Sequence, residues 1–324
     1  MTKIAGWNEL DDKAVAIARA LAMDAVQKVG NGHPGTAMSL APVAYNLFQR
    51  HLVHDPADPH WLGRDRFILS CGHSSLTLYT QLFFSGYGLE MEDMQSFRTW
   101  GSLTPGHPEY GHAKGIETTT GPLGQGISNA VGFAMAEQSL QSRYGKKIVD
   151  HYTYVIAGDG CLMEGVSQEA ITLAGKQKLN KLIVMWDDNN ISIDGEINIS
   201  DITDQQKRFE SAGWSVFVIN GHDPHEIDIA LTNAKKSTKP SMIACKTTIA
   251  VGVEGVENTA GGHGYNIKDP QLAQMRELYE WPYPKYEIPT DVKEAWLKIG
   301  SKGSSAHNEW NERFLNLSKS KLIK

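Results

Sequence analysis

The chain has 324 residues, of which 41% are hydrophobic and 21% are charged, so it can bury a large core as one or two domains. Its net charge of −6 and the lack of a basic run argue against nucleic acid as a partner. Three cysteines are too few and too scattered for a disulfide framework or a zinc site, which favours a reducing cytoplasm. The sequence has no signal-type apolar core and no apolar run of about 18 residues, so we expect neither secretion nor a membrane span.

Helix and strand patterns alternate along most of the chain. Apolar residues at helical spacing predict a first helix over 12–29, which ends at Gly30 as a helix should. Short apolar runs predict buried strands at 152–157, 181–186, 215–219 and 241–245. Further helices are expected at about 127–139, 162–174 and 224–234. Such alternation predicts an α/β fold in which a mostly parallel sheet carries helices on both faces.

The last part of the chain has a different pattern. From Asn266 onward the alternation loosens, because Pro270, Pro282, Pro284 and Pro289 interrupt it. We therefore expect one domain over residues 1–265, followed by a carboxyl-terminal extension over residues 266–324 that wraps the surface.

The stretch Gly158-Asp159-Gly160 and the pair Asn189-Asn190 each follow a predicted strand. Glycines let the backbone approach phosphate oxygens closely, and the N–H groups at a helix start suit a diphosphate. Asp159 supplies the hard oxygen that Mg²⁺ or Ca²⁺ prefers. Asn189 comes 30 residues later, at a second strand end, where open α/β sheets bind ligands. Together these residues predict a site for a diphosphate and its divalent metal ion.

Each of these motifs alone has an ordinary structural explanation. G-D-G is a common turn, and Asp and Asn close turns through their own side chains. In this order and at this spacing, however, they resemble the signature of thiamine diphosphate enzymes, which is G-D-G followed by N-N.

Other stretches resemble successive motifs of the transketolase family. They are N-G-H-P-G at 31–35, R-D-R-F at 64–67 with Gly72-His73, T-P-G-H-P at 104–108, E-T-T-T-G-P-L-G-Q-G at 117–126, and the tail from Trp281 to Trp296. The resemblance runs from about the first helix to about position 310. It covers the amino-terminal, diphosphate-binding part of a full transketolase.

Among the histidines that lie next to glycine or proline in loop-like stretches are His33, His73, His107 and His263. An imidazole can hold or pass a proton near neutral pH, although a lone histidine in a loop usually faces solvent. The resemblance implies that His33 and His263 contact the sugar carbonyl and relay protons. It also implies that His73 and His263 lie against the cofactor, and that His107 holds hydroxyls of the donor sugar. His33, His107 and His263 are thus the expected catalytic and substrate-binding residues.

The resemblance also places Gly121, Pro122 and Leu123 against the cofactor. Thiamine diphosphate reacts only when it is bent, so the protein must hold a side chain beneath the bend. A leucine flanked by glycines can do this, because the glycines let the loop come close and the leucine fills the angle. The structural alternative is a simple turn that opens the next helix.

The same resemblance gives the expected diphosphate and metal ligands. Gly158, Asp159, Gly160 and Asn189 would hold the diphosphate. Asp159, Asn189 and the backbone carbonyl of Ile191 would hold Mg²⁺ or Ca²⁺.

One loop departs from the family pattern. Many members carry T-H-x-x-H-G, whereas this chain reads Thr259-Ala260-Gly-Gly-His263-Gly264, followed by Tyr265-Asn266. The second histidine is present, but Ala260 takes the place of the first. Contacts to the donor sugar at this edge are therefore open to question.

The resemblance implies a transferase that uses thiamine diphosphate and a divalent metal ion. It would move a two-carbon glycolaldehyde unit from a ketose phosphate to an aldose phosphate. In the family a second domain grips the pyrimidine half of the cofactor, and the motifs of that domain are not in this sequence. We therefore expect a partner polypeptide, with this chain as a subunit of a split enzyme or a piece of a longer one. Self-pairing and a heterotetramer are expected from the family architecture.

Two alternatives remain open from the sequence. One is a related two-component ketol transferase that acts on sulfosugars or branched sugar phosphates. The other is a homologue without catalytic activity, which is disfavoured because the motif residues are intact.

Overall fold

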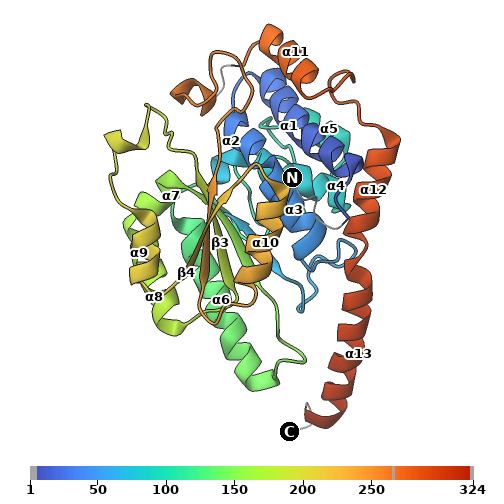
Figure 1. The fold of residues 1–324 in the computed structure, drawn as a ribbon. Helices are drawn as coiled ribbons and strands as arrows, with labels where there is room; N and C mark the ends of the chain where they lie inside the picture. Colours follow the sequence, from blue (N-terminus) through green and yellow to red (C-terminus); the bar gives the residue numbers. More distant parts are fainter. Residues whose placement is uncertain (1–5, 265–266, 322–324) are drawn as a thin grey trace.

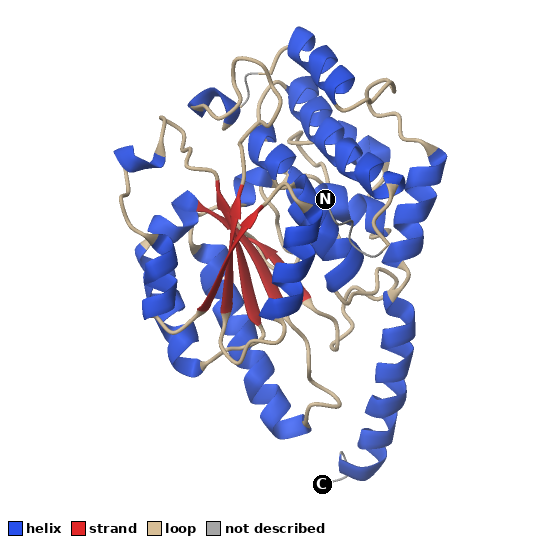
Figure 2. Cartoon of the chain, in the orientation of Figure 1, coloured by secondary structure: helices blue, strands red, loops and turns tan. Residues whose placement is uncertain are grey.

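The structure is a computed structural model that describes residues 6–264 and 267–321. Five strands form one parallel sheet in the order β1-β2-β3-β5-β4. The strands are β1 (Arg66–Leu69), β2 (Thr153–Gly158), β3 (Leu182–Asp188), β4 (Ser215–Asn220) and β5 (Ser241–Lys246). All five point the same way (Figure 2), so their carboxyl ends lie along one edge of the sheet. This confirms the predicted α/β fold with a parallel sheet.

Helices cover both faces of the sheet (Figure 1). Helices α6, α8 and α9 pack on one side, whereas α3 and α10 pack on the other. The helices are α1 (Glu9–Val29), α2 (Pro34–Ser39), α3 (Ala41–Asn46), α4 (Leu76–Ser85), α5 (Met91–Gln95), α6 (Gln125–Tyr144), α7 (Asp159–Met163), α8 (Gly165–Gln177), α9 (Gln205–Ser211), α10 (Pro224–Ala234), α11 (Asp269–Leu278), α12 (Thr290–Gly300) and α13 (Gly303–Lys321). Short helical turns are η1 (Leu47–His51, a π-helix), η2 (Gly72–Ser74), η3 (Ile197–Ile199) and η4 (Ala260–Gly262). None of the described helices is long and apolar enough to cross a membrane.

The predicted first helix is confirmed, and it begins three residues earlier than predicted. Asn8 caps it, since its side chain accepts a hydrogen bond from the backbone N–H of Leu10, and Asp11 accepts one in return from the N–H of Asn8. The helix ends at Gly30, which has the left-handed φ of 80° that favours glycine. These caps define both ends of α1, and the loop that follows Gly30 carries His33.

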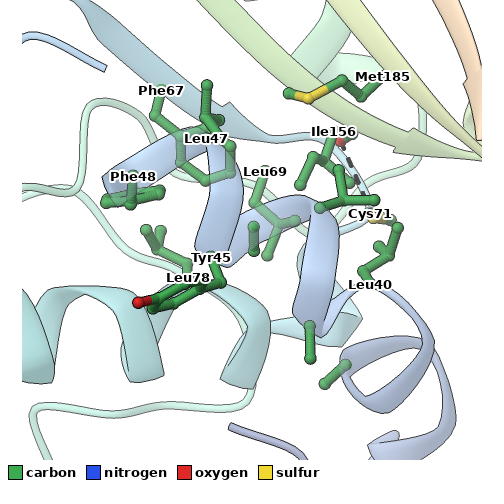
Figure 3. Packing of buried hydrophobic residues seen from close by; sticks show 14 of the residues in the cluster. Leu40, Tyr45, Leu47, Phe48, Phe67, Leu69, Cys71, Leu78, Ile156 and Met185 are labelled. Carbon is green, nitrogen blue, oxygen red and sulfur yellow. Dashed lines mark hydrogen bonds between the residues drawn. The ribbon is translucent and has the colours of Figure 1, made fainter. Parts of the chain in front are cut away.

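Part of the main core lies between the sheet and α2 to α4 (Figure 3). Leu69, Ile156 and Met185, from β1, β2 and β3, are nearly inaccessible to solvent. Leu40 and Leu47 pack toward them from the helices, and they are also fully buried. Burial of each such side chain stabilises the fold by about 1.5–3 kcal/mol. This packing makes the sheet a rigid support for the loops that follow its strands.

The strand β1 was not predicted. It has only four residues, Arg66 to Leu69, and it begins with a charged side chain, so its apolar run is too short to identify. Pairing with β2 brings Leu69 opposite Ile156. The chain that follows β1 therefore enters the same edge of the sheet as the end of β2.

The segment after residue 266 is mostly helical and comprises α11, α12 and α13. The sequence analysis did not predict these helices, because it gave weight to the prolines, which lie at helix starts and in the connections. Trp296 of α12 is buried and stacks on Phe84 with ring centroids 3.9 Å apart, so this part of the segment joins the main core. The predicted domain boundary, between Tyr265 and Asn266, lies outside the described residues.

Helix α13 packs on a separate small core. Trp310 of this helix joins Trp61, Ile148 and Val149 in a buried cluster apart from the main one. Its indole N–H donates to the backbone carbonyl of Ile148 at 2.7 Å. The first half of α13 is thus held by contacts that do not involve the sheet.

Candidate functional site

A cleft of about 460 Å³ opens at the carboxyl ends of the strands. It is lined by segments that lie far apart in the sequence, including residues that follow β1, β2 and β3. The predicted site residues that line it are His33, His73, His107, Gly121, Leu123, Gly158, Asp159, Gly160, Asn189, Ile191 and His263. Pro122 does not line the cleft, because this residue points to solvent and is exposed. The structure therefore brings together every predicted site residue except Pro122.

Two glycines bring His263 next to His33. A Cβ atom on Gly35 would lie 1.9 Å from the carbonyl oxygen of Gly262, so the two backbones can meet only where residue 35 is glycine. The backbone N–H of Ala250 also donates to the carbonyl of Gly35, at 3.3 Å. The loop that begins with Ala260 is thereby fixed against the start of α2. As a result, the rings of His33 and His263 lie 5.4 Å apart, centroid to centroid.

His73 completes a cluster of three imidazoles. It follows β1, in the turn η2, and its ring lies 5.0 Å from His33 and 5.2 Å from His263. Gly72 permits this turn, since a Cβ atom there would lie 3.0 Å from the backbone nitrogen of Gly121. Three segments, at 33, 73 and 263, thus converge on one wall of the cleft.

These imidazoles are neutral at pH 7. Burial, and next the neighbouring histidines, lower the pKa of His33 to about 4 and that of His73 to about 3. Burial also lowers the pKa of His263, and burial and Arg98 lower that of His107. The Nδ1 atoms of His33 and His263 are buried and have no hydrogen-bond partner among the described residues. A bound ligand with polar groups would supply these partners.

Asp159 lies at the end of β2, where α7 begins. The indole N–H of Trp186 donates to its Oδ1 at 2.9 Å, whereas its Oδ2 is buried without a partner in the part of the chain that is described. Burial, and next the nearby carboxylate of Asp187, raise the pKa of Asp159 to about 8. A carboxylate in this position fits a cation, because a positive charge would offset both effects.

Asn189 follows β3 and is buried. Its side-chain amide donates to Asp187 at 2.8 Å, and its side-chain carbonyl accepts from the backbone N–H of Ile191 at 2.9 Å. Asn190 has a φ of 61°, a left-handed conformation that Asn tolerates better than most residues. This bend turns the chain back, so Ile191 also lines the cleft. Asp159, Asn189 and Ile191 line the same cleft, and carboxylate, amide and backbone carbonyl oxygens are the ligands that Mg²⁺ or Ca²⁺ prefers.

The glycines of the two loops leave room for a flat or elongated ligand. A Cβ atom on Gly160 would lie 3.0 Å from Cδ1 of Leu123, and one on Gly121 would lie 3.5 Å from the His107 ring. Leu123 is half-buried on the wall of the cleft. A larger side chain at Gly160 would reduce the space beside Leu123, and one at Gly121 would approach the His107 ring.

Sequence reasoning missed several residues that line the cleft. They are Thr36, Cys71, Cys161, Asp187, Ser192, Ile193, Asp194 and Ser200. Asp187 comes two residues before Asn189, directly after the predicted strand 181–186, so its position was a usable signal. Residues 192–200 gave none, since they belong to a loop without helix or strand periodicity. The three cysteines are free and buried, as expected for small apolar side chains.

Comparison with known proteins decides the family. Residues 10–322 match the model of the thiamine diphosphate binding domain of transketolase. The chain belongs to the transketolase family. It is an amino-terminal, thiamine diphosphate-binding domain of that family of transferases.

Relatives and solved structures of the family agree with this assignment. The chain is 50% identical to the transketolase of Rhodobacter capsulatus over 306 residues, which is 94% of this chain and 46% of that protein. It is 47% identical to the transketolase of Mycobacterium tuberculosis over 95% of this chain and 45% of that protein. The crystal structure of the Campylobacter jejuni transketolase matches with a TM-score of 0.94 and 40% identity, over 98% of this chain and 50% of that one.

A further match is to a crystal structure of the Pichia stipitis transketolase in complex with sedoheptulose 7-phosphate. Its TM-score is 0.94 at 39% identity, over 98% of this chain and 48% of that one. The chain spans about half the length of the transketolases that it matches. The likeness therefore concerns the fold of the thiamine diphosphate binding domain.

Proposed function

We propose that this chain forms the diphosphate- and metal-binding half of a transketolase active site. With the other half, it would transfer a two-carbon glycolaldehyde unit from a ketose phosphate to an aldose phosphate. The observation that carries the proposal is the cluster of His33, His73 and His263, which lines the same cleft as Asp159 and Asn189. Neutral imidazoles in the same cleft as a buried carboxylate, one oxygen of which has no partner among the described residues, suit a reaction that moves protons next to a metal-bound diphosphate.

The ligand roles follow from the donor set. Asp159, the side-chain carbonyl of Asn189 and the backbone carbonyl of Ile191 would bind Mg²⁺ or Ca²⁺. Gly158, Gly160, Asn189, His73 and His263 would hold the diphosphate, because glycine backbones and imidazole N–H groups can donate to phosphate oxygens. When bound, thiamine diphosphate supplies the carbon nucleophile and the electron sink.

The remaining roles concern the sugar and the shape of the cofactor. Leu123, with Gly121 and Pro122 in its loop, would hold the cofactor bent. His33 and His263 would accept and return protons at the sugar oxygens through their unpartnered Nδ1 atoms or the opposite Nε2 atoms. His107, on the opposite loop, would hold hydroxyls of the donor sugar. The walls they form would orient the sugar and exclude water.

The proposal includes a partner. Known members of the family are about twice as long as the segment that matches, so the pyrimidine-binding and carboxyl-terminal domains would come from a second polypeptide or from the rest of a longer one. Ile193, Ile199 and Ile202 are exposed beside or near the cleft, at 72%, 67% and 91%, and would be covered by such a partner. Self-pairing of this chain within a heterotetramer, in a reducing cytoplasm, remains part of the proposal.

The metal assignment is tested with Asp159→Ala. We expect this variant to weaken binding of thiamine diphosphate in the presence of Mg²⁺ by more than roughly a hundred-fold. Loss of a residue that only hydrogen-bonds to a metal ligand already lowers metal affinity by about 10–100-fold. Asp194→Ala is the matched control, because Asp194 is an exposed carboxylate that lines the same cleft. Calorimetric titration with and without a chelator measures both. Equal affinity of wild type and Asp159→Ala, with no effect of the chelator, would refute the site.

The reaction is tested by glycolaldehyde transfer from xylulose 5-phosphate to an aldose phosphate acceptor. Activity is measured for the chain alone and with the missing half of a family member supplied as a separate polypeptide. We expect activity only in the second case. Full activity of the chain by itself would contradict the need for a partner, and cofactor binding without transfer in either case would contradict the reaction.

A further inference from the structure

Asp187 is a buried carboxylate at the end of β3 that the proposed ligand set does not use. Only 1% of its surface is accessible. Its Oδ2 accepts a hydrogen bond from the side-chain amide of Asn189 at 2.8 Å, and its Oδ1 accepts one from the hydroxyl of Thr247. Thr247 directly follows β5, the neighbour of β3 in the sheet. Two adjacent strand ends are thus linked through one carboxylate to one proposed metal ligand.

This arrangement fixes which way the Asn189 amide points. An ionised carboxylate can only accept hydrogen bonds, so the NH₂ group of Asn189 must face Asp187. The carbonyl end then faces the backbone N–H of Ile191, which donates to it at 2.9 Å. A carbonyl oxygen has two lone pairs, so one remains for a metal ion. If Asp187 did not hold the NH₂ group, the amide could rotate and present a donor to the metal instead of an oxygen.

A purely structural role for Asp187 accounts poorly for this position. Among the described residues Asp187 has no ion pair, although burial of a carboxylate is costly and an apolar side chain of similar size would often be more stable there. Its two hydrogen-bond donors are a proposed ligand and a side chain from the next strand. Where a folded protein buries a charged group without an ion pair, that group usually belongs to a functional site.

We propose that Asp187 and Thr247 are positioning residues, which hold the amide of Asn189 so that its oxygen faces the metal ion of the diphosphate site. The inference rests on the proposed function, because it takes Asn189 as a ligand. Thr247 orients the carboxylate of Asp187, and Asp187 orients Asn189. The metal site is therefore set by β5 as well as by β2 and β3.

The test uses Tb³⁺ in place of Ca²⁺, together with thiamine diphosphate. Its emission reports binding, and its lifetimes in H₂O and D₂O report how many water molecules it retains. We expect Asp187→Leu to weaken Tb³⁺ binding by roughly 10–100-fold, and the bound ion to gain about one water where the amide oxygen was. Thr247→Val should show the same change with a smaller amplitude. Asp187→Asn should restore most of the affinity, because its side-chain oxygen can still accept from Asn189.

Controls separate positioning from stability. Asp65→Asn alters another buried carboxylate of the fold, which accepts from the backbone N–H groups of Val53 and Tyr152 and does not line the cleft. It should lower the melting temperature without changing Tb³⁺ affinity or hydration. For Asp187→Leu we expect the reverse, a melting temperature near or above that of wild type with impaired metal binding.

The possible results distinguish this inference from the proposed function. Absence of Tb³⁺ binding by the wild type, or binding that Asn189→Ala leaves unchanged, would overturn the metal site and the inference with it. Binding that is lost in Asn189→Ala but keeps wild-type affinity and hydration in both Asp187→Leu and Thr247→Val would overturn the inference alone. If Asp187→Leu fails to fold, Thr247→Val decides by the same two measurements.

Discussion

Replacement of Gly35 by alanine should damage the site through a single added methyl group. In a helix such as α2, alanine is normally favoured over glycine by up to about 1 kcal/mol. Here the new Cβ would lie 1.9 Å from the carbonyl oxygen of Gly262, whereas an ordinary contact needs at least about 3.5 Å. The loop with His263 must therefore retreat by about 1.5 Å from His33. Overpacking of this kind costs about 1–3 kcal/mol and should outweigh the helical preference.

Two measurements check this prediction. We expect the melting temperature of Gly35→Ala to fall by roughly 2–8 °C. We also expect turnover of the complete enzyme to fall by up to about a hundred-fold, because the imidazole is displaced by more than 1 Å. Gly132→Ala is the matched control, since Gly132 lies within α6 and an added Cβ there would meet nothing within 4 Å. It should stabilise the protein by about 0.5–1 kcal/mol. The reasoning is refuted if Gly35→Ala behaves like Gly132→Ala.

Three further predictions concern the histidines and the first helix. His263→Ala should lower turnover of the complete enzyme by roughly ten-fold or more while the melting temperature barely moves; a large loss of stability with intact turnover per folded molecule would return this residue to a structural role. Asn8→Ala should cost about 1 kcal/mol in a denaturant titration, because α1 loses its cap, and an unchanged midpoint would contradict the capping box. Burial, and next the nearby Arg66, lower the pKa of His151 from 6.5 to about 3. At a pH between these two values, the unfolded chain therefore binds a proton at this residue and the folded chain does not. The free energy of unfolding should therefore fall as the pH drops from 6.5 toward 3, and His151→Phe should reduce that slope relative to wild type.

The sequence predicted the central strands well because their apolar runs are long. The runs at 152–157 and 181–186 became β2 and β3, which extend further at their carboxyl ends, β2 by Gly158 and β3 by Asp187 and Asp188. Asp187 and Asp188 lie beyond the predicted strand, although the ladder with β5 continues through both. Polar residues at the end of a parallel strand carry no apolar signal, even where they are paired and buried.

The sequence predicted which residues form the site better than it predicted how those residues are arranged. Spacing indicated that Asp159 and Asn189 would meet, since both follow strands of one parallel sheet. Nothing local to the sequence showed that the loop of His263 would touch the start of α2, because that contact depends on backbone approach at Gly35 and Gly262. Pro122 shared a motif with Leu123 but is exposed and does not line the cleft, because it lies in the turn that the N–H of Gln125 closes onto its carbonyl.

The order of strands in the sheet sets an order of events in folding. β4 pairs only with β5, and β5 lies between β3 and β4, so β4 has no place in the sheet until a later part of the chain has arrived. During synthesis, β3 would present an unpaired edge for more than 50 residues, and this edge carries Asp187 and Asn189 at its end. Docking of β5 covers the edge and delivers Thr247 in the same movement. A nascent chain that has not closed its sheet thus also lacks the contact that we propose orients Asn189 toward a metal ion.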